Sequence, residues 1–88
     1  MSLSDKTRLE IANTCYANVS GRFATFTNEK NRGPNFTWEG FITHCEETAD
    51  LWIDVAPCAF SGNKQEVYAE AAKMARDIAQ QLVKQATT

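Results

Sequence analysis

The sequence predicts a single α+β domain in which two helices pack on one face of a small antiparallel sheet of about three strands. Two observations lead to this prediction. Apolar residues near both ends recur at three- and four-residue spacing, whereas residues 22–27 and 36–56 are rich in aromatic and β-branched side chains. The 88 residues, 43% of them hydrophobic, suffice for one core, so we predict that residues 1–88 form one domain.

The clearest element is a long amphipathic helix over residues 63–86. Asn63 is a good N-cap residue, and Glu66 follows it three residues later in a capping-box arrangement. One face of this helix carries Val67, Ala71, Met74, Ala75, Ile78 and Leu82. At about 1.5 Å per residue the helix would be about 33 Å long. We therefore expect it to cross the whole molecule.

A first helix is predicted near residues 4–19. Ser4 or Ser2 can cap it, Asp5 suits its first turn, and Gly21 is a natural stop. The expected face carries Leu9, Ala12, Tyr16 and Val19, with Ile11 and Cys15 beside it. The segment that follows, 22–27, is predicted as a strand because it is rich in aromatic and β-branched residues.

Residues 27–35 are the most polar stretch of the chain and are predicted as a loop. Gly33 and Pro34 favour a turn there. Lys30 and Arg32 lie among three asparagines, so the loop either is a solvated connection or makes basic contacts with a partner.

Residues 36–56 fit two interpretations. As strands, 36–38 would pair with 22–27, and 41–45 and 51–56 would form a hairpin. As a helix over 37–55, Thr37 would be the N-cap. The buried stripe would then be Trp38, Ile42, Cys45, Ala49, Trp52 and Ile53, and Phe36 and Phe41 would form a hydrophobic staple. We favour the strands, and the alternative is a mostly helical protein.

Composition excludes several classes of function. The net charge of −2 is too balanced for an acidic nucleic-acid mimic and too low for a protein that mainly neutralises phosphates. We expect no signal peptide and no membrane span, because no sufficiently long apolar run occurs. Three cysteines without a CxxC pair favour reduced thiols and a cytoplasmic location.

No pattern of catalytic or cofactor-binding residues stands out, so we predict no enzyme and no cofactor. The sequence has no glycine-rich phosphate loop, no serine nucleophile elbow and no HExxH. The spacing of Cys15, His44, Cys45 and Cys58 matches no zinc pattern. A small enzyme that uses Cys45 or Cys58 with His44 remains a second alternative.

We predict instead a small non-catalytic protein that binds another protein, such as an accessory subunit or an inhibitor from a phage or mobile element. Aromatic side chains dominate contact hot spots, and an acidic rim would suit a basic partner. The candidate contact residues are Lys30, Arg32, Trp38, His44, Glu46, Glu47, Asp50, Trp52 and Phe60. We also expect that the protein can form a homodimer, through an edge strand or through the open face of the sheet.

The first alternative function is nucleic-acid binding. The predicted order of helix, three strands and helix resembles a double-stranded-RNA-binding domain, whose last helix begins K-K-x-A-K-x-x-A-A. Over residues 64–72 the matches are Lys64, Ala71 and Ala72, while Gln65 and Tyr68 replace two lysines that grip phosphates in that family. Nucleic-acid binding would use Lys30, Arg32 and Lys64, of which Lys64 matches the family's pattern, although the missing lysines count against RNA binding.

Overall fold

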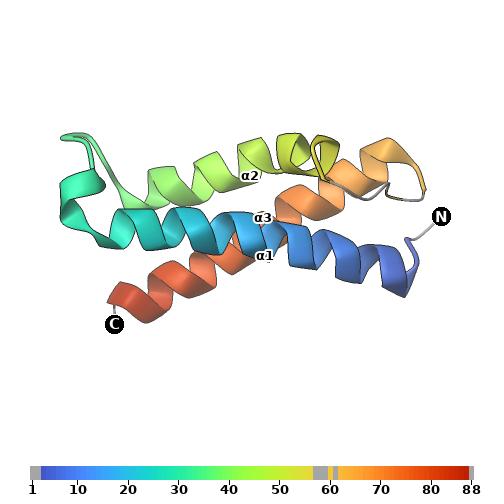
Figure 1. Ribbon diagram of the computed structural model, residues 1–88, viewed down its shortest axis with the longest axis horizontal. Coiled ribbons are helices and arrows are strands. Elements are labelled where there is room, and N and C mark those ends of the chain that lie inside the picture. Colours follow the sequence, from blue (N-terminus) through green and yellow to red (C-terminus); the bar gives the residue numbers. More distant parts are fainter. Residues whose placement is uncertain (1–2, 57–59, 61, 88) are drawn as a thin grey trace.

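The chain folds into three long helices joined by two connections (Figure 1). The computed structural model describes residues 3–56, 60 and 62–87. These contain α1 (Asp5–Thr27), a 3₁₀ turn η1 (Glu29–Asn31), α2 (Trp38–Asp54) and α3 (Lys64–Thr87). No strand occurs in those residues, so the predicted α+β fold is wrong and the alternative of a mostly helical protein is right.

The first correction concerns the strand predicted over 22–27 and the helix stop predicted at Gly21. Helix α1 begins after the Ser4 N-cap, as predicted, but it continues through Gly21 to Thr27. Phe23 and Phe26, three residues apart, both pack against the core. Burial on one helical face outweighs the β-propensity of this segment, because propensity is a weak local preference that tertiary packing overrides.

The second correction concerns residues 36–56. Instead of a strand at 36–38 and a hairpin of 41–45 and 51–56, the chain forms α2. The Thr37 hydroxyl accepts a hydrogen bond from the Gly40 N–H at 2.9 Å, which is the cap of the alternative interpretation. The buried residues of α2 are Phe41, Cys45, Ala49, Trp52 and Ile53. The segment 46–50 contains no Gly, Pro or Asn, which explains why it continues a helix rather than making a turn.

Helix α3 is confirmed, together with its Asn63 cap, and it supports the other two helices. Asn63 Oδ1 accepts hydrogen bonds from the N–H groups of Gln65 and Glu66. In Figure 1, α3 crosses behind α1 from a start near the C-terminal end of α2, and it packs against both helices. The side chains of Ala71, Ala75 and Ala79 are fully buried at this contact. Such small side chains let the neighbouring backbones come close.

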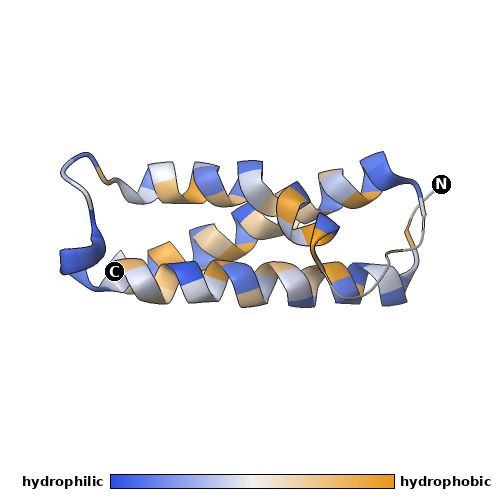
Figure 2. Ribbon diagram, turned by 45° about the horizontal axis from the view of Figure 1, so that its top comes forward, coloured by the Kyte–Doolittle hydropathy of each residue, from blue (hydrophilic) through white to orange (hydrophobic). Residues whose placement is uncertain are grey.

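Helix α1 buries a different face from the one predicted. Ile11, Cys15 and Val19 are fully buried, whereas Leu9 and Tyr16 are 62% and 53% exposed. The Cys15 thiol donates to the Ala71 carbonyl oxygen at 3.5 Å, which marks the contact line with α3. Figure 2 shows hydrophobic and hydrophilic residues alternating along every helix. No described helix is long and apolar enough to cross a lipid bilayer.

Besides the buried Cys15–Ala71 hydrogen bond, three surface contacts between described side chains link α3 to its neighbours. Arg8 of α1 pairs with Glu70 at 3.6 Å, and Arg76 pairs with Glu46 of α2 at 2.9 Å. The Tyr68 hydroxyl donates to Asp54 at 2.6 Å, and this hydrogen bond is the main reason why the pKa of Tyr68 is raised. All three contacts lie at the surface, so we assign them to orientation more than to stability.

Helix α1 provides a direct test of the fold at Gly21. A Cβ atom added at Gly21 would meet nothing within 4 Å, and the position lies inside the helix. We expect Gly21→Ala to raise the free energy of unfolding by about 0.5–1 kcal/mol, because alanine loses less backbone entropy in a helix. Urea unfolding followed by circular dichroism measures the change.

Gly62→Ala is the matched control for this substitution. Gly62 has a φ of 112°, which an alanine adopts only with strain, and its added Cβ would lie 3.1 Å from Leu3. We expect this variant to be destabilised. A Gly21→Ala protein that is less stable than the wild type would contradict the continuous α1.

Candidate functional site

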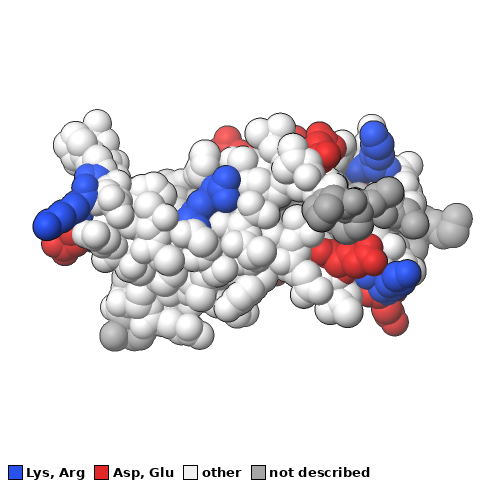
Figure 3. All heavy atoms as spheres, viewed as in Figure 1, with Lys and Arg blue, Asp and Glu red and all other residues white. Residues whose placement is uncertain are grey.

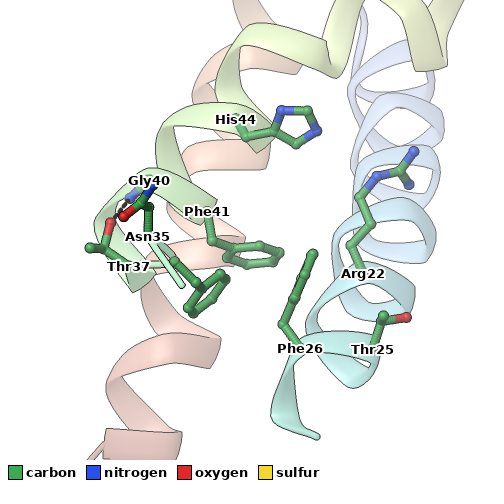
Figure 4. A pocket seen from close by; sticks show the side chains of 9 residues that line it. Arg22, Thr25, Phe26, Asn35, Thr37, Gly40, Phe41 and His44 are labelled. Atoms are coloured by element: carbon green, nitrogen blue, oxygen red, sulfur yellow. Dashed lines mark hydrogen bonds between the residues drawn. The ribbon is translucent and has the colours of Figure 1, made fainter. Parts of the chain in front are cut away.

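A groove lies between the C-terminal half of α1 and the N-terminal half of α2. Its volume is about 630 Å³, within the range of pockets that bind ligands in proteins. Arg22, Thr25 and Phe26 line it from α1, and Gly40, Phe41 and His44 line it from α2; Asn35, Phe36 and Thr37 complete it. Figure 4 shows Arg22 and His44 at one end of this α1–α2 groove, and Phe26 and Phe41 at the other.

The apolar end of the groove is part of a cluster of five aromatic rings. Phe26 stacks on Phe36 with ring centroids 5.1 Å apart, and Phe41 meets the edges of Phe26 at 5.9 Å and of Trp38 at 5.7 Å. Phe23 completes the cluster by packing on Trp38 at 5.4 Å. Aromatic pairs add about 0.5–1.5 kcal/mol each beyond their buried area. The cluster therefore holds the ends of α1 and α2 together and fixes this wall of the groove.

Arg32 covers the aromatic cluster from the connecting loop. Its Nε donates to the Phe26 carbonyl oxygen at 2.7 Å, and its guanidinium lies 5.0 Å from the ring centroid of Trp38 and 5.5 Å from that of Phe36. Glu29 lies 3.9 Å from the same guanidinium. Arg32, which we predicted as a partner contact, instead binds groups of its own chain at the connected ends of α1 and α2. Lys30, beside it, is exposed.

Arg22 lies at the polar end of the groove in a fixed position. Its Nη1 is 3.3 Å from both the carbonyl oxygen and the side-chain oxygen of Asn18. Its guanidinium carbon is 4.9 Å from the ring centroid of Trp52 on α2. Among the arginines, all of which the structure describes, Arg8, Arg32 and Arg76 each have a carboxylate partner, and Arg22 has none among the described residues. Arg22 is therefore a pre-positioned cation at the edge of an apolar groove.

Exposed apolar residues continue the α2 wall beyond His44. Leu51 and Val55 follow His44 by seven and eleven residues, which places all three on one side of α2. Leu51 is 59% exposed and Val55 is 81% exposed. In Figure 3, which views the molecule as Figure 1 does, the surface over the middle of α1 and α2 is mostly uncharged. Leu51 and Val55 thus add exposed apolar area on the side of α2 that His44 shares with the groove.

Two of the four acidic residues in the second half of α2 are engaged with α3. Glu46 binds Arg76 and Asp54 accepts from Tyr68, so both are engaged with α3. Asp50 is exposed, and its carboxylate accepts a hydrogen bond from the Leu51 N–H. Glu47 is exposed as well. Glu46, Asp50 and Asp54 follow one another at four-residue steps and Glu47 is next to Glu46, so the 100° step between residues places all four on one side of α2. Two of them are engaged with α3 and are not free for a partner.

The residues of the nucleic-acid alternative are not brought together. Lys30 and Arg32 lie in the connection at one end of the long axis, and Lys64 begins α3 at the other end (Figure 1). The helix–sheet–helix order that carried the resemblance to a double-stranded-RNA-binding domain is absent from the described residues. That basis for the alternative is removed.

The cysteines with described positions are buried. Cys15 and Cys45 are fully buried, and this burial raises the pKa of each thiol to about 11. A thiol that stays protonated at neutral pH is a poor nucleophile, so this environment opposes the Cys45–His44 hypothesis. Cys58 lies outside the described residues. No group of three or more metal-binding side chains occurs in the part of the chain that the structure describes.

The predicted aromatic anchors contribute mainly to the core. Trp52 is 4% exposed, and its indole N–H has no hydrogen-bond partner among the described residues. Trp38 and Phe60 are half-buried and pack against the core. Of the predicted contact residues, His44 is the one that lines the groove.

Comparison with protein-family profiles, curated proteins and solved structures gave no significant match.

Sequence reasoning missed most of the groove. The strand prediction covered Arg22 and Phe26 as well as Phe36 and Phe41, and the helical alternative treated the last two as a hydrophobic staple. The available signal was the spacing of His44, Leu51 and Val55, three residues on one side of a helix that already had a complete apolar face elsewhere. An apolar residue outside the core stripe of an amphipathic helix indicates a contact surface.

The Arg32 contacts predict a specific loss of stability. We expect Arg32→Ala to lower the free energy of unfolding by about 1–3 kcal/mol, because it removes a charged hydrogen bond and two cation–π contacts. Arg32→Lys should restore little, since a lysine lacks the planar guanidinium. Lys30→Ala, in the same loop but exposed, is the control and should change stability by less than about 0.5 kcal/mol. Equal effects of the two alanine substitutions, measured by urea unfolding, would contradict the role of Arg32.

The buried thiols predict a loss of stability at alkaline pH. Each folded-state pKa is raised from 9.0 to about 11. Both states therefore hold the proton below pH 9, and between pH 9 and 11 the unfolded chain loses it first. The free energy of unfolding should fall across this window and level off above it. The double variant Cys15→Ala/Cys45→Ala should show a shallower fall in the same urea titrations, and an identical slope would refute the assignment.

Proposed function

We propose that this protein is a small non-catalytic binding protein that works by taking up an apolar segment of another protein in the α1–α2 groove. The main support is an open apolar surface of defined shape beside the core. The groove contains Phe26, Phe36 and Phe41, and the exposed Leu51 and Val55 lie on the same side of α2 as His44, which lines it. Exposed apolar surface of this kind marks interaction sites in proteins.

The dimensions of the surface favour a protein segment over a compact small molecule. Gly40 and Val55 are fifteen residues apart on α2, which corresponds to about 22 Å along a helix. An apolar helix lying in a groove is a recurring mode of peptide recognition, with anchors at successive turns. A partner segment of about four helical turns would cover the whole surface.

Self-association needs a different basis from the one first predicted. The expected homodimer relied on an edge strand or an open sheet face, and the described residues contain no sheet. A second copy of the chain is therefore one outcome of the binding test rather than the partner we propose. Light scattering on the protein alone separates the two cases.

The groove is tested with a matched pair of substitutions. A peptide is first selected from a random helical library for binding to the wild-type protein. Its affinity for the Thr25→Trp variant should be lower by at least about tenfold, because the indole would occupy the groove. Thr43→Trp is the control, since Thr43 is also an exposed threonine within a helix but does not line this groove. Calorimetry measures both affinities. Failure to select any peptide, or equal affinities for the two variants, would refute the proposal.

A further inference from the structure

We infer that the segment bound in the α1–α2 groove carries a carboxylate that Arg22 binds, so that Arg22 determines which segments are accepted. This inference rests on the proposed function and adds the chemistry of the partner. The aromatic cluster would receive an apolar side chain of the same segment. Apolar surface alone selects weakly, and a fixed charge supplies discrimination.

The hydrogen-bonding capacity of Arg22 is the first step of the argument. A guanidinium carries five N–H donors. Its Nη1 donates hydrogen bonds to the two oxygen atoms of Asn18. Within the described residues, Nε and Nη2 have no hydrogen bond, and their three N–H groups match the two oxygen atoms of a carboxylate. Arg22 thus places a positive charge at the groove, and no described residue places a carboxylate beside it.

The position of Arg22 is held before any ligand binds. Asn18 fixes one nitrogen, and the ring of Trp52 supports the face of the guanidinium at 4.9 Å. An arginine held in this way loses less side-chain entropy on binding than a free one, and its flat face is already shielded from water. His44, from the opposite wall, adds a further polar group at the same end (Figure 4).

The separation between the charged and apolar ends defines the spacing in the ligand. Arg22 is one helical turn from Phe26, and its guanidinium reaches back to Asn18, about one turn further. The two ends are therefore on the order of 11 Å apart, or two turns of a helix. We expect ligands with a Glu or Asp about seven residues from a bulky apolar side chain.

The test is a double-mutant cycle with a peptide selected on the wild-type protein. Arg22→Gln in the protein, and Glu→Gln in the peptide, should each lower the affinity about tenfold or more. Combined, they should cost no more than either change alone, because one contact is removed in both cases. Arg8→Gln is the matched control, as this α1 arginine is paired with Glu70 of α3. Additive effects, or selected peptides without an acidic residue, would overturn the inference.

Further measurements keep the two proposals separable. Arg22→Lys retains the charge but loses the planar fork, so we expect an intermediate affinity, and it replaces Arg22→Gln if that variant unfolds. Binding should also weaken as salt is raised. Binding that Thr25→Trp abolishes but Arg22→Gln leaves intact would disprove the role of Arg22 while upholding the groove. Binding that depends on neither would refute both.

Discussion

The structure depends on the close contact that α3 makes with the two other helices through small side chains. Ala71, Ala75 and Ala79 are fully buried, and none of them fills much space. The largest fully buried side chains come from the partners, such as Ile11 and Val19 of α1, and Trp52 of α2 is almost fully buried as well. Because α3 occupies one side of both helices, α1 and α2 meet each other mainly through the aromatic cluster at their connected ends. The α1–α2 groove is a direct result of this arrangement.

The three arginines that hold the fold together have carboxylate partners, and they differ in this from Arg22. The cations at Arg8, Arg32 and Arg76 are each matched by an acid of the same chain, and they orient helices or close the loop. Arg22 is supported by an amide and a ring instead. A support without opposite charge fixes the position of a cation and leaves its charge available. This difference, more than exposure or proximity in sequence, distinguishes the binding candidate from the structural arginines.

The sequence was a reliable guide where the local signals agreed and a poor one where they competed. The long helix from Asn63, the Ser4 cap and the loop around Gly33 were predicted correctly because caps, periodicity and turn residues gave the same answer. Residues 22–27 and 36–56 were misassigned because aromatic and β-branched residues suit strands and also fill a helix core. For the groove, His44 was a candidate, but Arg22 was not. Its importance comes from contacts with Trp52, thirty residues away, which no local pattern reveals.

The reliance of α1 and α2 on α3 also constrains how the protein is made. Ribosomes add about 5–20 residues per second, and α3 ends 33 residues after α2 (87 − 54), so α3 is complete roughly two to seven seconds after α2. During that interval the inner faces of Ile11, Val19 and Trp52 lack the surface that buries them in the finished fold. The helix that packs against both others is thus the last of the described helices along the chain, so the core closes only after α3 has been made.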